Sequence, residues 1–289
     1  MEIRKVSVIV PVYNEKEAIV DDIAVIHKTM AASRWDYEVI VVDDASTDGT
    51  AEILKGIDGI KVLTHEMNRG GGFSRNTGIR ASTGDVFVVT DGDGTYPNQD
   101  IPRLLDEMEE RNLDMVVGAR VKEKGTMKVL RGSAKWFIRT LATTMSGFKI
   151  PDLNSGLRAI RKEVFMQFME ILPWGHSWVS TITLAMLSSG YGVAYLDIDY
   201  YPRKGTSTFH PIKDTYAYLT LVIRTITWFN PLKVFIPTAL VIFLIGVGKF
   251  AFDNYEHFWR MTPATVMLFL VAVQIAMLGL LADLIVKRR

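Results

Sequence analysis

The sequence of 289 residues has no cysteine and almost no net charge, and two long stretches near its end lack charged side chains. Without cysteine the chain forms neither disulfides nor thiolate metal sites. Its 33 basic and 32 acidic residues give a formal net charge of +1, which disfavours nucleic acid as a partner because such a partner normally requires a basic stripe. Membranes, small molecules and oxygen-ligated metals remain as classes of partner.

Two motifs are also missing. A dinucleotide-binding domain would carry the glycine motif G-x-G-x-x-G after its first strand, and its absence disfavours NAD. The chain starts with Met1-Glu2-Ile3-Arg4-Lys5 and then enters a strand-like run, without an apolar signal-peptide core. We therefore expect about the first 200 residues to remain in the cytoplasm.

The two uncharged stretches, 234–248 and 261–282, predict membrane helices. A helix needs about 20 mostly apolar residues to cross a bilayer core. The second stretch is long enough, and the first is long enough if it continues to Phe252 with Lys249 reaching toward the interface. The alternative is a pair of buried core helices.

The charges around these stretches predict their orientation. Basic residues lie on the two outer flanks and acidic residues lie in the connecting loop: Arg224, Lys233, Lys287, Arg288 and Arg289 outside, Asp253 and Glu256 between. By the positive-inside rule the pair forms a hairpin with both ends in the cytoplasm. The predicted location is the cell membrane, with a multi-pass anchor and a cytoplasmic catalytic domain.

The first 120 residues alternate short β-branched runs with helix-like stretches, which predicts βα units around a largely parallel sheet. The predicted strands are 6–10, 38–43, 60–63, 86–91 and 115–119. In open α/β sheets ligands bind beyond the carboxyl ends of the strands, and acidic residues follow three of these strands. The fold class is therefore α/β, with a ligand site on that edge.

Asp91 and Asp93 flank a glycine directly after an apolar strand. Such a pair suits Mg²⁺ or Mn²⁺, since Mg²⁺ uses one or two carboxylates together with substrate phosphates and water. The same string also occurs as an ordinary turn. Asp43 and Asp44 end a neighbouring strand, where Ser46 or Asp48 could equally cap a helix.

Three segments, in this order and spacing, resemble family 2 glycosyltransferases of GT-A fold. They are Val-Ser-Val-Ile-Val-Pro-Val-Tyr-Asn-Glu at 6–15, Val-Val-Asp-Asp-Ala-Ser-Thr-Asp-Gly-Thr at 41–50 and Asp-Gly-Asp-Gly-Thr-Tyr-Pro at 91–97. Further segments are similar to polyprenyl-phosphate sugar synthases, the dolichyl-phosphate mannose or glucose synthase group: 68–78, 116–120, 151–158 and 203–207. The resemblance covers about the first 210 residues.

The resemblance implies a set of donor-site residues. Nucleoside-binding positions match Pro11, Tyr13, Glu15 and Asp43, with Asp44 beside them. The metal positions match Asp91 and Asp93, with Thr95 where related enzymes often carry a glutamine ligand. Arg203 matches a position that binds the diphosphate, with Ser207 in the same segment; the alternative for Arg203 is a surface arginine. We expect UDP rather than GDP-mannose as donor type.

The resemblance also implies an acceptor site. A phosphate monoester is already ionised near neutral pH, since its second pKa is about 6, and it needs binding rather than deprotonation. Arg120 and Arg131 match lipid-phosphate positions of the family, with Ser133 and Lys135 close to Arg131 along the chain. The alternative for Arg131 is a solvated helix charge.

Asp152 and Asn154 are assigned to hydrogen bonds with sugar hydroxyls or to the shape of their loop. His176 stands near a position where relatives often have an acidic residue, and either contacts substrate or packs between Trp174 and Trp178. The mechanism implied is a direct inverting displacement on the nucleotide-sugar by a polyprenyl phosphate.

The predicted domains are a catalytic domain at 1–210, an interfacial amphipathic helix at 211–230 and a two-helix hairpin at 231–289. A helix packed on the soluble domain is the alternative for the middle segment, and self-association is left open. Two other functions compete: glycosyl transfer to a hydroxyl of a glycan or glycolipid with Asp152 as base, and a non-catalytic membrane protein.

Overall fold

The structure, a computed structural model, describes residues 2–123, 143, 147–175, 177–202, 220, 223–256 and 261–287. Its centre is a mixed seven-stranded sheet with the order β3-β2-β1-β4-β6-β5-β7. The strands are β1 (Lys5–Val12), β2 (Asp36–Asp43), β3 (Ile60–Thr64), β4 (Val86–Val89), β5 (Met115–Glu123), β6 (Arg158–Arg161) and β7 (Val193–Tyr200). Among these described strands, only β6 runs antiparallel to its neighbours, β4 and β5.

The five strands expected from sequence are present, with ends shifted by a few residues. Two strands escaped prediction. The strand β6 has four residues and an arginine at each end, so it lacks an apolar run. The strand β7 pairs with β5 in parallel and is the edge strand on that side of the sheet. The expectation of a largely parallel sheet is confirmed, with β6 as its exception.

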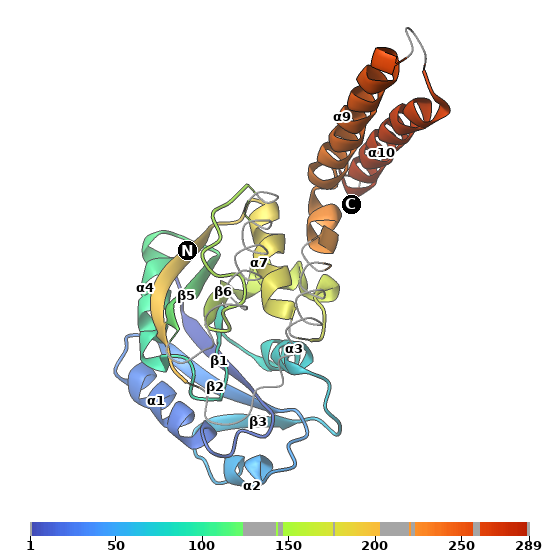
Figure 1. Ribbon diagram of the computed structural model, residues 1–289. Coiled ribbons are helices and arrows are strands. Elements are labelled where there is room, and N and C mark those ends of the chain that lie inside the picture. The colour runs from blue at the N-terminus through green and yellow to red at the C-terminus, as the bar shows by residue number, and fades with distance from the viewer. Residues whose placement is uncertain are drawn as a thin grey trace.

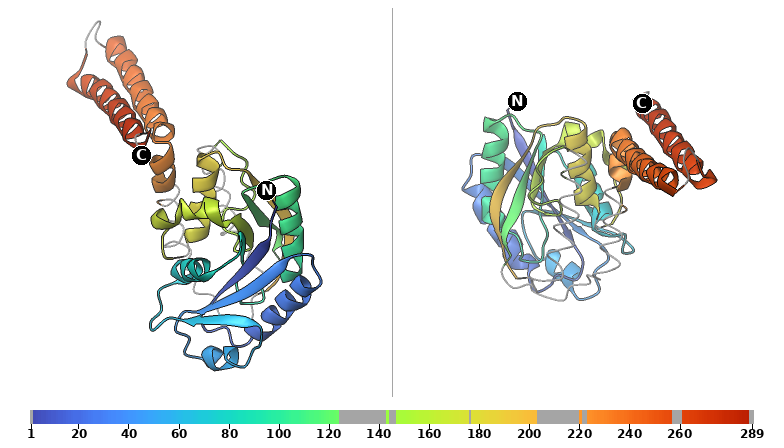
Figure 2. Two further views of the ribbon diagram at one scale, coloured as in Figure 1. Left: turned by 180° about the vertical axis from the view of Figure 1, so that it is seen from behind. Right: turned by 45° about the horizontal axis from the view of Figure 1, so that its top comes forward.

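Helices cover both faces of the sheet (Figure 1, Figure 2). The segments are α1 (Ile19–Ala31), α2 (Thr50–Leu54), α3 (Gly71–Ala81), η1 (Asn98–Asp100), α4 (Ile101–Glu110), α6 (Lys162–Met166), η2 (Met169–Ile171) and α7 (Trp178–Ser188). On β1, Val8 and Val10 face the core shared with α1 and α4, whereas Ile9 faces the core shared with α3 and α7. Alternation along a strand thus fills two apolar layers.

The strands β1, β2 and β4 run parallel and end at one edge. Val12 pairs with Asp43 across β1 and β2, and Ile9 pairs with Val89 across β1 and β4. Asp91 therefore lies two residues beyond its strand, on the same edge as Asp43. This register brings the acidic turns together.

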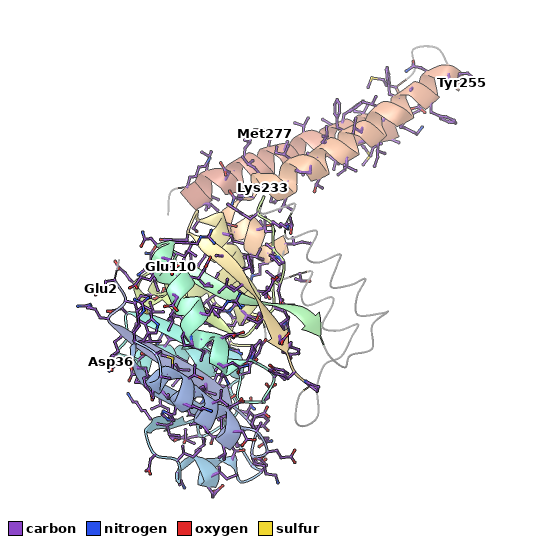
Figure 3. All side chains as sticks on the ribbon, turned by 90° about the vertical axis from the view of Figure 1, so that its left-hand side faces the viewer. Glu2, Asp36, Glu110, Lys233, Tyr255 and Met277 are labelled. Carbon is purple, nitrogen blue, oxygen red and sulfur yellow. The ribbon has the colours of Figure 1, made fainter. Side chains whose placement is uncertain are left out.

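Two apolar helices, α9 (Leu232–Glu256) and α10 (Pro263–Lys287), form a hairpin that projects from the α/β domain (Figure 1). A Cβ atom on Gly279 would lie 2.5 Å from Cβ of Phe235, so glycine is what allows the two helices to approach there. Figure 3 places Lys233 beside the domain and Tyr255 at the far end, with side chains projecting outward along both helices. Each helix is long and apolar enough to cross a membrane.

The segment before the hairpin was predicted to be an interfacial helix at 211–230, and most of it lies outside the described residues. Residues 223–229 are helical. Ile226 is buried against Leu184 of α7, and the Phe229 ring lies 6.1 Å from that of Phe168. Trp228 remains 43% exposed. The described part thus packs on the α/β domain with one side open, and the domain boundaries stay a prediction.

Candidate active site

Hydrogen bonds join the turns after β1 and β2. The backbone N–H of Asn14 donates to Oγ of Ser46 (2.9 Å), and the N–H of Thr47 donates to Oδ1 of Asn14 (2.8 Å). Asn14 has a φ of 57°, a conformation that asparagine tolerates better than most residues. Glu15 is buried, and its N–H donates to Oγ1 of Thr50. The turns after β1 and β2 are therefore joined by hydrogen bonds into one wall at the carboxyl ends of these strands.

Asp43 lies at the base of this wall and is 1% exposed. Its Oδ1 accepts a hydrogen bond from the N–H of Ser46 at 3.2 Å. Its Oδ2 is buried and has no hydrogen-bond partner among the described residues. An unpaired buried oxygen is costly, so this atom is suited to accept an N–H or O–H from a ligand. Tyr13, on the rim above, is 43% exposed.

Asp44 has other partners. Its Oδ1 accepts hydrogen bonds from Nδ1 of His65 (2.7 Å) and the N–H of Arg69 (3.0 Å), and its Oδ2 accepts the N–H of Gly70 (2.7 Å). Nε2 of His65 contacts Oγ1 of Thr77 on α3 at 3.0 Å. Asp44 thus anchors the glycine-rich turn that begins α3. Direct substrate binding by Asp44 stays a prediction.

Asp91 faces α3. Its Oδ1 accepts a hydrogen bond from Nη2 of Arg75 at 2.7 Å, and its side chain is 32% exposed. Arg75 is itself nearly buried, and its guanidinium lies 5.7 Å from the centre of the Trp178 ring. Arg75 was not singled out from sequence, although it lies in the segment 68–78 that carried part of the resemblance. The ion pair sets the direction of the Asp91 carboxylate.

Asp93 is 8% exposed and accepts two hydrogen bonds at Oδ1 from Thr95, one from the hydroxyl at 2.5 Å and one from the backbone N–H at 3.2 Å. Thr95 is fully buried, and its hydroxyl donates a hydrogen bond to Asp93. In this structure Thr95 therefore supports the Asp93 carboxylate. Metal ligation by Thr95 stays a prediction.

The two carboxylates fit a divalent cation of the hard type. In the described part of the chain no group of three or more His, Cys, Asp or Glu side chains could hold a metal by itself. Mg²⁺ sites commonly have one or two carboxylates and are completed by substrate phosphates and water. Asp91 and Asp93, on a turn at the open edge of the sheet, match that composition.

Arg120 and Asp152 form a nearly buried bidentate pair close to this turn. Nε and Nη2 of Arg120 donate to the two carboxylate oxygens at 2.6 and 2.9 Å, and the backbone N–H of Arg120 also donates to Oδ2 of Asp152 at 3.2 Å. The guanidinium lies 5.2 Å from the Tyr200 ring centre. Tyr96 packs edge-on against Tyr200 with ring centres 5.3 Å apart.

The electrostatics of this pair keep both members charged. Burial raises the pKa of Asp152, but hydrogen bonds and the charge of Arg120 outweigh burial and hold the pKa below its ordinary value. Burial lowers the pKa of Arg120, and the neighbouring Tyr96 and Asp152 outweigh that and raise it well above its ordinary value. The sequence did not indicate this pairing, since 32 residues separate the partners.

Gly156 leaves room for Asp91. A Cβ atom at this position would lie 2.7 Å from Oδ2 of Asp91 and 3.1 Å from Cε2 of Tyr96. We expect Gly156→Ala to displace the carboxylate and to lower kcat by about 10²-fold, since a shift of about 1 Å has that effect on a positioned group. Initial-rate kinetics check this. In the control Gly56→Ala the added Cβ makes only an ordinary contact at 3.5 Å, and a loss of the same size there would contradict the prediction.

Several predicted residues lie outside the described residues: Arg131, Ser133, Lys135, His176, Arg203 and Ser207. Their roles stay predictions. The structure brings Asp43, Asp91, Asp93, Arg120 and Asp152 to one edge of the sheet, on turns or strand ends. Pro11 is part of β1 and pairs with Val42, below the rim.

Comparison with known families gives two matches. The model described as Glycosyl transferase family 2 matches residues 7–168, and the model described as GtrB C-terminal hairpin matches residues 230–287. The second match, together with the two apolar helices, associates the chain with a membrane. A membrane-bound hairpin thus follows the α/β domain.

Individual relatives and structures agree with these matches. The dodecaprenyl-phosphate galacturonate synthase of Rhizobium johnstonii is 25% identical over 300 residues, which cover 98% of this chain and 88% of that protein. The undecaprenyl-phosphate 4-deoxy-4-formamido-L-arabinose transferase of Proteus mirabilis is 32% identical over 168 residues, 56% of this chain and 51% of that protein. The crystal structure of glucosyl-3-phosphoglycerate synthase from Mycobacterium tuberculosis with Mn²⁺, uridine diphosphate and phosphoglyceric acid has a TM-score of 0.61 at 18% identity, and the match covers 77% of this chain and 78% of that one. This likeness confirms the predicted GT-A type of α/β fold.

Proposed function

Since the chain belongs to glycosyl transferase family 2, we propose that it transfers a monosaccharide from a nucleotide-sugar to the phosphate of a polyprenyl lipid, with inversion at the anomeric carbon. The relatives named for dodecaprenyl- and undecaprenyl-phosphate products support this acceptor class. The matched hairpin supports it as well, because it brings the catalytic domain to the membrane that holds the lipid.

The observation that carries the proposal is the bidentate pair of Arg120 and Asp152. The carboxylate fixes the guanidinium plane, and Nη1 of Arg120 is not used by Asp152. A fixed guanidinium is the group that binds a phosphate oxygen with defined direction. The acceptor then needs no protein base, because its phosphate oxygen is already ionised near neutral pH.

The donor would bind across the wall formed by the first two turns. Oδ2 of Asp43 is placed to accept an N–H of a nucleobase or a hydroxyl of ribose. Asp91 and Asp93 would hold Mg²⁺ or Mn²⁺ against the diphosphate, and this cation would stabilise the charge on the leaving nucleoside diphosphate. Arg75 keeps Asp91 directed, and Thr95 keeps Asp93 directed. The uridine diphosphate and Mn²⁺ bound by the mycobacterial enzyme support UDP over GDP-mannose and a divalent cation here.

The membrane arrangement is part of the proposal. Both helices of the hairpin cross the bilayer as a multi-pass anchor, and the catalytic domain lies in the cytoplasm. Lys233 at the start of α9 and Lys287 at the end of α10 support that orientation by the positive-inside rule. A catalytic domain of 1–210, a junction of 211–230 and a hairpin of 231–289 remain the proposed divisions.

The alternative acceptor, a hydroxyl, would need Asp152 as its base. Both oxygens of Asp152 already accept hydrogen bonds from Arg120, and its pKa is lowered, which makes it a poor base. We expect Asp152→Asn to lower the rate with polyprenyl phosphate by no more than about 10-fold, whereas loss of a general base costs about 10²–10⁴-fold. Steady-state rates of the wild type and of Asp152→Asn decide whether Asp152 acts as a general base.

The pH profile separates the same two readings. The acceptor phosphate loses nucleophilic charge as the pH falls through its second pKa of about 6, so the rate should fall on that acid side. The lowered pKa of Asp152 keeps its carboxylate ionised throughout this range. We expect the acid limb near pH 6 to persist in Asp152→Asn. A limb that disappears with the carboxylate would instead assign the proton transfer to Asp152.

A further inference from the structure

A buried carboxylate on the first helix contacts the turn that carries Asp91 and Asp93. Asp22 of α1 is 6% exposed. Its Oδ2 accepts the backbone N–H of Gly94 at 2.8 Å, and its Oδ1 accepts Nδ2 of Asn98 at 3.2 Å. Gly94 lies between the second carboxylate and Thr95, and it has a φ of 74°, which glycine adopts without strain. Asp22 thus holds the turn at the residue whose φ is positive.

The same hydrogen-bond network holds the two ends of the turn together. Asn98 is 1% exposed, and its Oδ1 accepts the hydroxyl of Thr90 at 2.7 Å. Thr90 immediately precedes Asp91, and its backbone N–H donates to the carbonyl of Ile9 on β1 at 3.2 Å. The chain from Asp22 through Asn98 to Thr90 therefore fixes both ends of residues 91–97 relative to the sheet.

The chemistry of the network requires a carboxylate at position 22. The Gly94 N–H and the Asn98 amide, which face it, are both donors. A carboxylate supplies two accepting oxygens, whereas an asparagine supplies one oxygen and one NH₂ group. Asp22→Asn therefore sets a donor against a donor without a change of size. This explains a buried charge on a helix face whose other buried residues are Ile19, Ile23, Ile26 and Met30.

We propose that Asp22 is a positioning residue for the divalent cation: through Gly94 and Asn98 it fixes the turn that carries the Asp91 and Asp93 carboxylates. The inference rests on the proposed function, in which these two carboxylates bind the cation. Partners behind metal ligands typically contribute about 10–100-fold to metal affinity. Asp22 contacts the backbone of the turn at Gly94 and the side chain of Asn98, so its contribution should appear first in cation binding.

The adjacent Asp21 provides a matched control. Asp21 and Asp22 both stand in the first turn of α1, where a negative charge interacts favourably with the helix dipole. Asp21 is exposed, whereas Asp22 faces the turn. Asp21→Asn and Asp22→Asn remove the same charge from the same helix turn. A difference between them therefore reports the contacts of Asp22 and not the charge of the helix.

The experiment titrates Mn²⁺ into the purified full chain in detergent with saturating UDP, and free Mn²⁺ is followed by electron paramagnetic resonance. We expect Asp22→Asn to raise the Kd for Mn²⁺ about 10-fold or more and Asp21→Asn to change it less than about 2-fold. Thermal unfolding of each protein reports folding. Thr90→Val, which keeps the charge and the side-chain shape but removes the donor to Asn98, should weaken Mn²⁺ binding in the same direction and decides the question if Asp22→Asn does not fold.

The outcomes separate the two proposals. If the wild-type chain binds no Mn²⁺, the metal dependence of the proposed function fails and the positioning role fails with it. If the wild-type chain binds Mn²⁺, and if Asp22→Asn and Thr90→Val both bind it with the wild-type Kd, only the positioning role is overturned. Equal weakening in Asp21→Asn and Asp22→Asn would also overturn it, since charge alone would then account for the effect.

Discussion

Asp93→Asn is expected to lower kcat for sugar transfer by about 10³-fold or more. Loss of one of two carboxylates removes most of the affinity for the cation, and a bound cation contributes several kcal/mol to stabilising charge in the transition state, or about 10³-fold in rate. The contacts of Thr95 would persist in part, because the asparagine oxygen can still accept its hydroxyl. The fold should therefore survive, as thermal unfolding would show.

The measurement is the initial rate over a range of Mg²⁺ or Mn²⁺ concentrations. A partial return of the Asp93→Asn rate at high Mn²⁺ would locate the defect in metal binding. Asp58→Asn is a suitable control, since this residue is exposed on the connection between α2 and β3. A rate for Asp93→Asn within about 10-fold of wild type at saturating donor would contradict the assigned role.

Arg120→Gln is expected to reduce transfer to polyprenyl phosphate by about 10²–10³-fold while leaving UDP binding unchanged. Asp152 holds the guanidinium in place, and in the proposed function this group binds the acceptor phosphate, so its loss would remove charge-assisted hydrogen bonds to that phosphate. The substitution also leaves the Asp152 carboxylate nearly buried without its partner. Breaking such a pair costs about 3–5 kcal/mol of stability, so a fall in Tm accompanies the fall in rate.

The double substitution Arg120→Gln/Asp152→Asn separates these two effects. It removes both charges, so most of the lost Tm should return because no uncompensated carboxylate remains. The rate should not return, because the phosphate still lacks its guanidinium. Recovery of the rate together with the Tm would show that Arg120 acts only by neutralising Asp152, and the acceptor site would then have to lie elsewhere.

The strands β1, β2 and β4 could be predicted because their apolar runs end in turn residues. β1, β2 and β4 are each rich in β-branched residues, and Pro, Asp or Gly occurs at or just after the end of each apolar run. β6 could not be predicted in this way. Its position between β4 and β5 is set by antiparallel pairing over long sequence separations. The two Nη atoms of its fully buried Arg158 donate to the hydroxyl of Thr183 and to the carbonyls of Val179 and Ser155.

The placement of the acidic residues at one edge of the sheet could be predicted, but their partners could not. Asp91 follows an apolar strand, and that local pattern identified it. Its ion pair with Arg75 depends on how α3 packs, and the contacts of Asp44 with His65 and Gly70 depend on the path of the glycine-rich turn. Such contacts arise from tertiary packing, and a periodic pattern of residues carries no information about them.

The most direct test of the central claim is transfer of radiolabelled sugar from a panel of UDP- and GDP-sugars to polyprenyl phosphate. Membranes containing the full chain would be assayed with and without EDTA, beside membranes with Asp93→Asn. The account predicts a charged glycolipid that is labile to mild acid, forms from a UDP-sugar, and is lost both with EDTA and in Asp93→Asn. Label that never enters lipid phosphate but enters a neutral lipid or glycan would contradict the account and make Asp152 the residue to test as a base.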